Sequence, residues 1–256
     1  PEYDFGHMVS GDENMNLRER LSLRFIGRVI ASEEGRAHLL NQCADAEGNG
    51  ENGFFEHILA HVDDPALGKM ITKHRDDELR HEQLFIAARE RTGIDPSPVP
   101  SELKLLDRLD RAVGGFFAQP LRARRDVMEA YLMLQVIEER ALTQFALFEL
   151  AFRDVDPETA DAIAEIARDE ERHLKYCHAI AKRYAPDAAI ARETVRELRQ
   201  LEARCFAENG RANMQHLFDR KWVAVNPVEK LFWQAVNGLS ARGEPPLTQF
   251  AHAEVA

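Results

Sequence analysis

A five-residue motif, Asp-Glu-x-Arg-His, occurs twice in this chain of 256 residues. The first copy covers residues 77–81 and the second covers residues 169–173. Within each copy the Glu and the His are three residues apart, so on a helix their side chains lie on one face and can bind one metal ion together. Two copies predict a two-metal site between helices.

The two copies belong to a longer internal repeat with an offset of 92 residues. The same offset relates the Asp-Pro pair at residues 64–65 to the pair at residues 156–157, and relates Glu47 to Glu139. An Asp followed by Pro is a helix start signal, because Asp caps the helix and Pro suits its first position. Each half is therefore predicted to form a helical hairpin: a helix with a Glu, a turn at Asp-Pro, and a helix with Glu-x-x-His.

Helical patterns continue along the rest of the chain, and no segment alternates apolar and polar residues as a strand would. Three prolines in residues 93–101 predict an extended crossover between the hairpins. We predict an all-α fold with a single domain over residues 1–256, a core of about residues 35–185 and a C-terminal helical extension of about residues 187–242. The predicted helical segments are 16–62 with at least one break, 65–91, 101–113, 120–152, 157–185, 187–220 and 227–240.

Composition narrows the class of protein. The formal net charge of −11 argues against a general nucleic-acid binder, and solubility explains it simply. No apolar run approaches the roughly 20 residues that span a bilayer, and no secretory signal is visible. Cys43, Cys177 and Cys205 form no Cys-x-x-Cys pair, which excludes a rubredoxin-type iron centre and predicts a cytoplasmic location.

The motif and its repeat resemble the ferritin-like di-iron carboxylate superfamily, which carries a Glu on one helix and Glu-x-x-His on the next in each of two hairpins. The resemblance covers about residues 35–185 and implies a ferritin-like four-helix bundle with a long crossover. It also implies two Fe ions or a mixed Mn/Fe pair, since both metals accept carboxylate and imidazole ligands. The implied ligands are Glu47, Glu78, His81, Glu139, Glu170 and His173, with Glu78 and Glu170 as bridges.

The Asp before each ligand Glu resembles the oxygen-activating branches of that superfamily. A metal-bound His needs an acceptor for its other ring nitrogen. By this resemblance Asp77 would orient His173, and Asp169 would orient His81, each from the opposite hairpin. The alternative is that the Asp and Arg residues of the motif are ordinary surface charges. The arginines that could hold the aspartates are Arg80 and Arg172.

Other residues near the motif leave alternatives open. Thr143 lies one helical turn after Glu139, where several di-iron oxygenases place a Thr near the oxygen site, although it could be a small core residue. Glu51 holds the matching position in the first hairpin and is either an extra ligand or an exposed Glu. Glu138 points about 100° away from Glu139 and is not predicted to be a ligand. Phe85 stands where ribonucleotide reductase small subunits keep a radical-bearing tyrosine, which argues against that function.

The leading hypothesis is a di-iron oxidase or oxygenase that uses O₂ to oxidise a small, hydrophobic organic substrate. It implies an electron donor such as a ferredoxin or another reductase, and a homodimer is compatible with the long C-terminal helices. The first alternative is a ferroxidase, an iron-storage protein or a rubrerythrin-like peroxidase. The second is a non-catalytic interaction protein that is stabilised by a metal.

Overall fold

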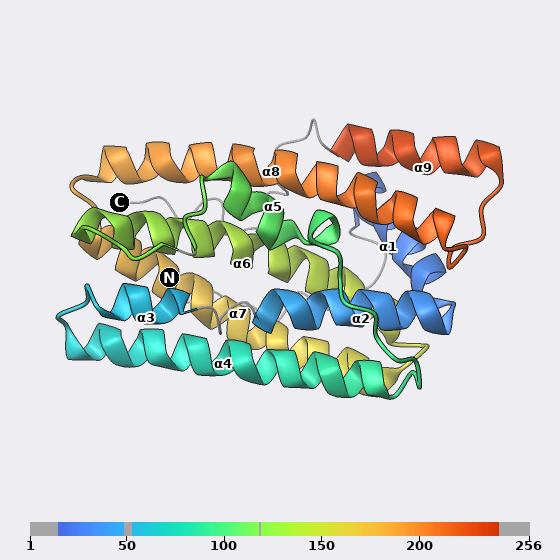
Figure 1. The fold of residues 1–256 in the computed structure, drawn as a ribbon, viewed down its shortest axis with the longest axis horizontal. Helices are drawn as coiled ribbons and strands as arrows, with labels where there is room; N and C mark the ends of the chain where they lie inside the picture. Colours follow the sequence, from blue (N-terminus) through green and yellow to red (C-terminus); the bar gives the residue numbers. More distant parts are fainter. Residues whose placement is uncertain (1–14, 49–52, 118, 241–256) are drawn as a thin grey trace.

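In a computed structural model, residues 15–48, 53–117 and 119–240 are described, and within these ranges the protein is helical without strands (Figure 1). The absence of strands in the described residues agrees with the predicted all-α class. The helices are α1 (Leu17–Ile30), α2 (Glu33–Glu47), α3 (Phe54–Leu59), α4 (Pro65–Glu90), the 3-10 helix η3 (Ser101–Leu103), α5 (Leu105–Ala112), α6 (Arg124–Phe152), α7 (Pro157–Tyr184), α8 (Ala188–Asp219) and α9 (Pro227–Ser240).

Asp caps followed by Pro start the two helices that carry the motif. Asp64 Oδ1 accepts a hydrogen bond of 2.9 Å from the backbone N–H of Ala66 at the start of α4. Asp156 Oδ1 accepts one of 3.2 Å from the backbone N–H of Thr159 at the start of α7. Each side chain satisfies a backbone donor that the first helical turn leaves free. Both predicted starts are confirmed, whereas the predicted segment 16–62 is divided into α1, α2 and α3.

Four helices enclose the centre of the molecule. α6 packs along α7, α2 packs along α4, and α4 also contacts α7. Figure 1 shows α4 and α7 on one side of α6, with α8 on the other. The four helices come from the two halves of the sequence repeat, and the motif residues of α4 and α7, which are 92 positions apart, face one another.

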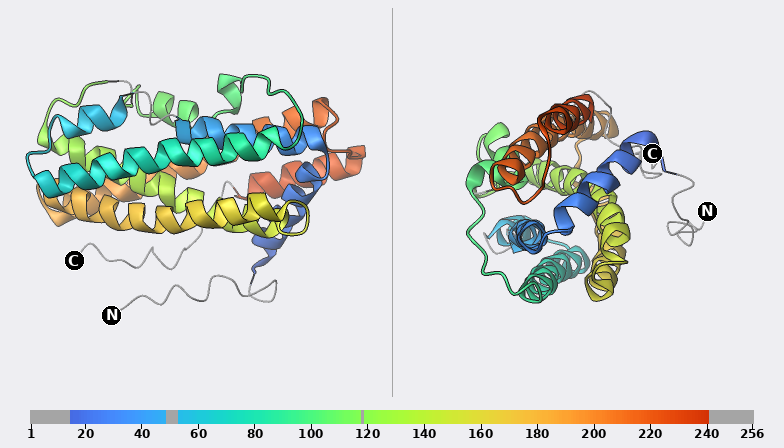
Figure 2. Two further views of the ribbon diagram at one scale, coloured as in Figure 1. Left: turned by 90° about the horizontal axis from the view of Figure 1, so that it is seen from below. Right: turned by 90° about the vertical axis from the view of Figure 1, so that its right-hand side faces the viewer.

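Helices α8, α9 and α1 pack around these four. α8 packs against α6, and α9 turns back along α8. α1 crosses the end of the molecule, as the end-on view of Figure 2 shows, and contacts α2, α6 and α9. None of the helices in the described ranges is both long enough and apolar enough to cross a membrane.

Two separate apolar cores lie along the four central helices. One contains Ile71 of α4, Tyr131 of α6 and Ile180 of α7. The other contains Phe85 of α4 and Phe152 of α6, together with residues from the first half of α7. On α4 and on α7 the motif residues lie between the residues that belong to one core and those that belong to the other. The repeat therefore places a polar cluster in the interior, with an apolar layer on either side of it.

Candidate metal centre

The two Glu-x-x-His helices bring their side chains together in the interior. His81 Nδ1 on α4 lies 3.0 Å from Glu170 Oε1 on α7. In the reciprocal contact, His173 Nδ1 on α7 lies 3.2 Å from Glu78 Oε1 on α4. The side chains of His81 and His173 are completely buried, and 1% of the Glu170 side chain and 13% of the Glu78 side chain are exposed. Each histidine thus faces a glutamate of the opposite hairpin.

The first group of potential ligands consists of Glu47, Glu78, His81 and Glu170. One ligand atom from each of these residues can be chosen such that all lie within 4.8 Å of one another. Glu47 comes from the last turn of α2, and its Oε2 lies 3.5 Å from His81 Nδ1. This group matches the predicted ligands of one metal together with the two predicted bridges.

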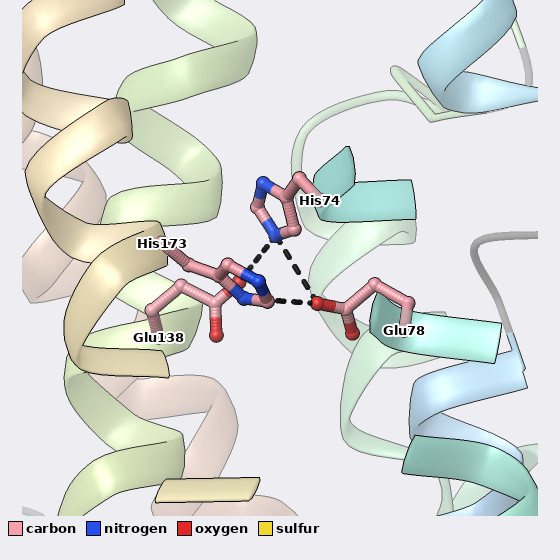
Figure 3. A group of neighbouring side chains, drawn as sticks. All are labelled: His74, Glu78, Glu138 and His173. Carbon is pink, nitrogen blue, oxygen red and sulfur yellow. Dashed lines mark hydrogen bonds and ion pairs between the residues drawn. The ribbon is translucent and has the colours of Figure 1, made fainter. Parts of the chain in front are cut away.

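The second group consists of His74, Glu78, Glu138 and His173, and its ligand atoms meet the same 4.8 Å limit. Figure 3 shows His74 and Glu78 approaching from α4, with Glu138 and His173 opposite them. His74 Nε2 lies 3.1 Å from Glu138 Oε1 and 3.1 Å from Glu78 Oε1. Glu78 belongs to both groups, so its carboxylate lies between two potential metal positions.

Glu139 lies outside both groups, and Glu138 takes the place that the repeat assigned to it. The Glu139 carboxylate instead accepts a 2.8 Å hydrogen bond from Arg199 Nε of α8 and a 3.0 Å hydrogen bond from Gln135. Glu138 is only 5% exposed and reaches His74. Consecutive residues on a helix point about 100° apart, so both side chains cannot face the centre. The structure therefore favours Glu138, whereas the sequence analysis selected Glu139 because the repeat implies the same rotation for α2 and α6.

His74 was missed by the sequence analysis. It lies four residues before Glu78 on α4, and it is completely buried. A spacing of four residues places both side chains on one helix face, so the sequence did contain a signal. The repeat obscured it, because position 166, the counterpart in the second half, is an isoleucine. The centre is therefore asymmetric, with a third histidine near Glu138.

Aspartates lie behind the two motif histidines, at the places that the resemblance implied. His173 Nε2 lies 3.3 Å from Asp77 Oδ2, and His81 Nε2 lies 3.2 Å from Asp169 Oδ2. An acceptor at Nε2 leaves Nδ1 directed toward the centre, which is the arrangement that orients a metal-bound imidazole. The arginines of the motif contact these aspartates across the helix pair, Arg80 with Asp169 and Arg172 with Asp77.

The contacts of the two motif histidines with carboxylates determine their charge. Burial lowers the pKa of His81, but the nearby carboxylates, Glu170 first, outweigh burial and raise this pKa to about 10. Burial likewise opposes the charge of His173, whose pKa is nevertheless raised by Asp77, Glu170 and Glu78. Burial raises the pKa of Glu78, yet the adjacent histidines bring it well below the ordinary value. Imidazolium–carboxylate contacts therefore balance charge in the metal-free centre.

The outer members of the two groups are shifted toward their neutral forms. Burial and then the charge of Glu78 raise the pKa of Glu47. Burial and then the charge of Glu170 raise the pKa of Glu138. Burial lowers the pKa of His74. Two divalent cations would remove the need to protonate Glu47 and Glu138, because each cation stabilises an adjacent carboxylate anion, and neutral His74 is already in the form that binds a metal.

The donor set fits two divalent ions of the iron or manganese type. Four carboxylates, of which Glu78 is half-buried and the other three are buried, and three buried imidazoles supply the hard oxygen and borderline nitrogen ligands that these metals prefer. His81 Nδ1 and Glu78 Oε1 are buried and make no hydrogen bond of acceptable geometry with the described residues. Buried polar atoms without such partners are rare in folded proteins, and atoms that face a metal position are one explanation.

A cavity of about 760 Å³ adjoins the centre. Glu47, Glu78 and Glu138 form part of its wall, and Thr143 also lines it. Thr143 Oγ1 donates a 3.0 Å hydrogen bond to the backbone carbonyl of Glu139, as threonines inside helices often do. The predicted position of Thr143 near the centre is therefore compatible with both interpretations of this residue. Glu51 lies outside the described residues.

Comparisons with protein-family models, with curated proteins and with solved structures found no match to this chain. The function must therefore be argued from the residues themselves.

Proposed function

We propose that this protein is a di-iron oxidase or oxygenase with a ferritin-like arrangement of helices, and that it uses O₂ to oxidise a small organic substrate. The observation that carries this proposal is the pair of buried ligand groups that share Glu78. A carboxylate that belongs to both groups supports a two-metal site, because it would hold two ions close together. Electrons would come from a ferredoxin or another reductase.

In this proposal Glu47 and His81 would hold one ion, and Glu138, His173 and His74 would hold the other. Glu78, which belongs to both groups, and Glu170 of the facing helix would supply further carboxylate ligands. When bound, a pair of redox-active ions would supply the electrons and the open coordination positions that reduction of O₂ needs. A mixed Mn/Fe pair would accept the same ligands.

The rest of the chain supports this chemistry in three ways. Asp77 and Asp169 hold the imidazole rings in one orientation, which preserves the geometry of a site when its charge changes. The two apolar cores exclude water above and below the polar cluster. The cavity brings an organic molecule to the carboxylates from the side of α1 and α8.

The cavity also favours an organic substrate over iron as the substrate. A protein that stores or oxidises iron needs a polar route for hydrated ions, whereas aromatic residues such as Phe25, Phe145 and Phe148 line this cavity. A mostly apolar wall with a few polar groups is typical of small-molecule sites.

Anaerobic loading with Fe(II), a count of bound iron per chain, and then mixing with O₂ would test the proposal. We expect two irons per chain, rapid oxidation and a change in the visible spectrum. The variant Glu170→Ala should lose iron binding and O₂ consumption together. Slow oxidation with mineral formation would favour iron handling instead. If the folded protein does not bind iron in a stoichiometric amount when Fe(II) is added, the enzyme assignment is refuted.

A further inference from the structure

The cavity beside the metal centre extends well beyond it. Helices α1, α2, α6, α8 and α9 all contribute to its wall. α1, which packs against α2 and α6, forms part of this wall, and its residues Leu21, Phe25 and Ile26 line the cavity. At about 760 Å³ the cavity is within the range of roughly 300–1,000 Å³ that small-molecule sites have.

Two of the three cationic side chains that the described residues contribute to this wall are neutralised. Arg140 of α6 donates two hydrogen bonds of 2.8 Å to Glu202 of α8, and both side chains are almost completely buried. Lys104 Nζ lies 2.5 Å from Asp45 Oδ1. These pairs explain how the chain tolerates two buried or half-buried cations next to an apolar cavity.

Arg18, in the first turn of α1, is the third cation. The structure gives its half-buried guanidinium neither a hydrogen bond nor an ion pair with any described residue. The carboxylate of the adjacent Glu19 is engaged elsewhere, because it accepts a 2.8 Å hydrogen bond from the backbone N–H of Asn16. Burial and then the positive charge of Arg140 lower the pKa of Arg18, and they outweigh the opposing negative charges of Glu19 and Glu202. An arginine stays charged in proteins, so an anion at this position would relieve both effects.

Other polar atoms in the same wall also lack partners. Trp233 Nε1, Asn209 Oδ1 and His38 Nε2 are buried and make no hydrogen bond with the described residues. Such atoms are normally satisfied by protein, by water or by a ligand. They form a second, independent indication that the cavity is built to hold a molecule with polar groups.

We propose that the cavity binds an amphipathic carboxylic acid, with its carboxylate on Arg18 and its apolar body extending past Phe25 and Phe145 toward the metal centre. A guanidinium and a carboxylate match as a planar, doubly hydrogen-bonded pair. Among the described residues, Arg18 is the one cation of this wall without an ion pair, and the charges of Glu19 and Glu202 already act on it, which suits a monoanion better than a phosphate dianion. That this acid is oxidised there rests on the proposed function, whereas its binding does not.

Calorimetric titration of the full chain with octanoate and with octanamide tests the assignment, because the two probes differ only in charge at one end. The variants are Arg18→Met, Arg18→Lys and the control Arg24→Met, which removes an exposed arginine of the same helix. In Arg18→Met we expect octanoate to bind roughly 10- to 100-fold more weakly, as for a lost hydrogen-bonded charge pair. The affinity for octanamide should change less than about twofold, because octanamide is neutral and forms no charge pair with Arg18.

Arg18→Lys should retain part of the preference for octanoate, since it keeps the charge but not the planar fork. Arg24→Met should leave both affinities unchanged. Equal weakening of both probes in Arg18→Met would show a packing defect and overturn the assignment. If the affinity for octanoate does not depend on Arg18 but requires bound metal, the carboxylate binds the ions, and the assignment is overturned as well. No binding of octanoate or of its longer homologues would also overturn it.

This experiment separates the two proposals. Arg18-dependent octanoate binding in a protein that binds no iron would refute the oxidase and leave the ligand assignment standing. If the protein binds two irons and consumes O₂ rapidly, but substitution of Arg18 does not change octanoate binding, the oxidase proposal stands and the ligand assignment is refuted.

Discussion

Adjacent glutamates on α6 have different predicted roles, so a pair of isosteric substitutions separates them. Glu138 faces the candidate metal centre and Glu139 faces Arg199. We expect Glu138→Gln to lose metal and keep stability, and Glu139→Gln to lose stability and keep metal. A strictly symmetric repeat predicts instead that Glu139→Gln loses metal and that Glu138→Gln keeps it.

The magnitudes follow from burial and charge. Removing the carboxylate of Glu138 should lower the affinity for one of the two metals by more than about 100-fold. Even the loss of an outer hydrogen-bond partner of a ligand lowers metal affinity by roughly 10- to 100-fold. Without metal, the free energy of unfolding of this variant should differ from that of the parent by less than about 1 kcal/mol. The reason is that Gln has the size of the neutral acid, which the raised pKa of Glu138 favours.

Glu139→Gln breaks a hydrogen-bonded ion pair whose side chains are 13% and 23% exposed. Exposed pairs contribute up to about 1 kcal/mol, and removing one partner of a buried pair destabilises by about 3–5 kcal/mol. We therefore expect a loss of about 1–3 kcal/mol, which corresponds to a fall in Tm of roughly 2–10 °C for a chain of this size.

The assay is the iron content per chain after anaerobic loading, together with thermal unfolding of the chelator-treated protein. Two irons in Glu138→Gln with about one or none in Glu139→Gln would refute the placement of α6. Equal metal loss in both variants would show that the ion pair to Arg199 is needed to position the helix, and it would contradict separate roles.

Further predictions concern the histidines, their partners and the core. Asp169→Asn should weaken metal binding by roughly 10- to 100-fold without unfolding the protein, as measured by competition with a chelator. His74→Gln should weaken one metal only, which two-step binding isotherms would reveal; equal loss of both metals would contradict the asymmetric site. Because the pKa of His81 is about 10 in the folded protein against about 6.5 unfolded, its contribution to metal-free stability is complete below pH 6.5 and is lost as pH rises through 10. Thermal unfolding with a chelator should therefore show a falling Tm over that interval, and a rising Tm would contradict the protonated state. Phe85→Ala should destabilise the protein by about 3–5 kcal/mol in denaturant titrations, since Phe85 is 1% exposed in the second apolar core.

The repeat predicted the parts of the centre that depend on local geometry. Glu78 and His81 share a helix face because they are three residues apart, and this holds wherever the helix is placed. The Asp-Pro starts of α4 and α7 are equally local, since a cap needs only the next few residues. The aspartates behind the histidines followed from the resemblance, and the structure places them within hydrogen-bonding distance.

The rotation of α6 was not visible in the sequence. An offset of 92 residues relates Glu47 to Glu139, but it holds only if both helices turn the same face to the centre. α8 packs against α6, and Arg199 of α8 binds Glu139. α8 belongs to the part of the chain that follows the repeat, so the repeat itself contains no information about this contact.

The cavity and Arg18, which has no ion pair with any described residue, were equally hidden. Arg18, Arg140 and Glu202 are far apart in the sequence, and which cation is neutralised depends on how α1 and α8 cross α6. The sequence by itself determined the helices, their starts and the residues that share one helix face, because these are set by interactions within a few residues. Only the tertiary structure decided which faces meet, because helix rotation and long-range charge pairing depend on the packing of all neighbouring helices at once.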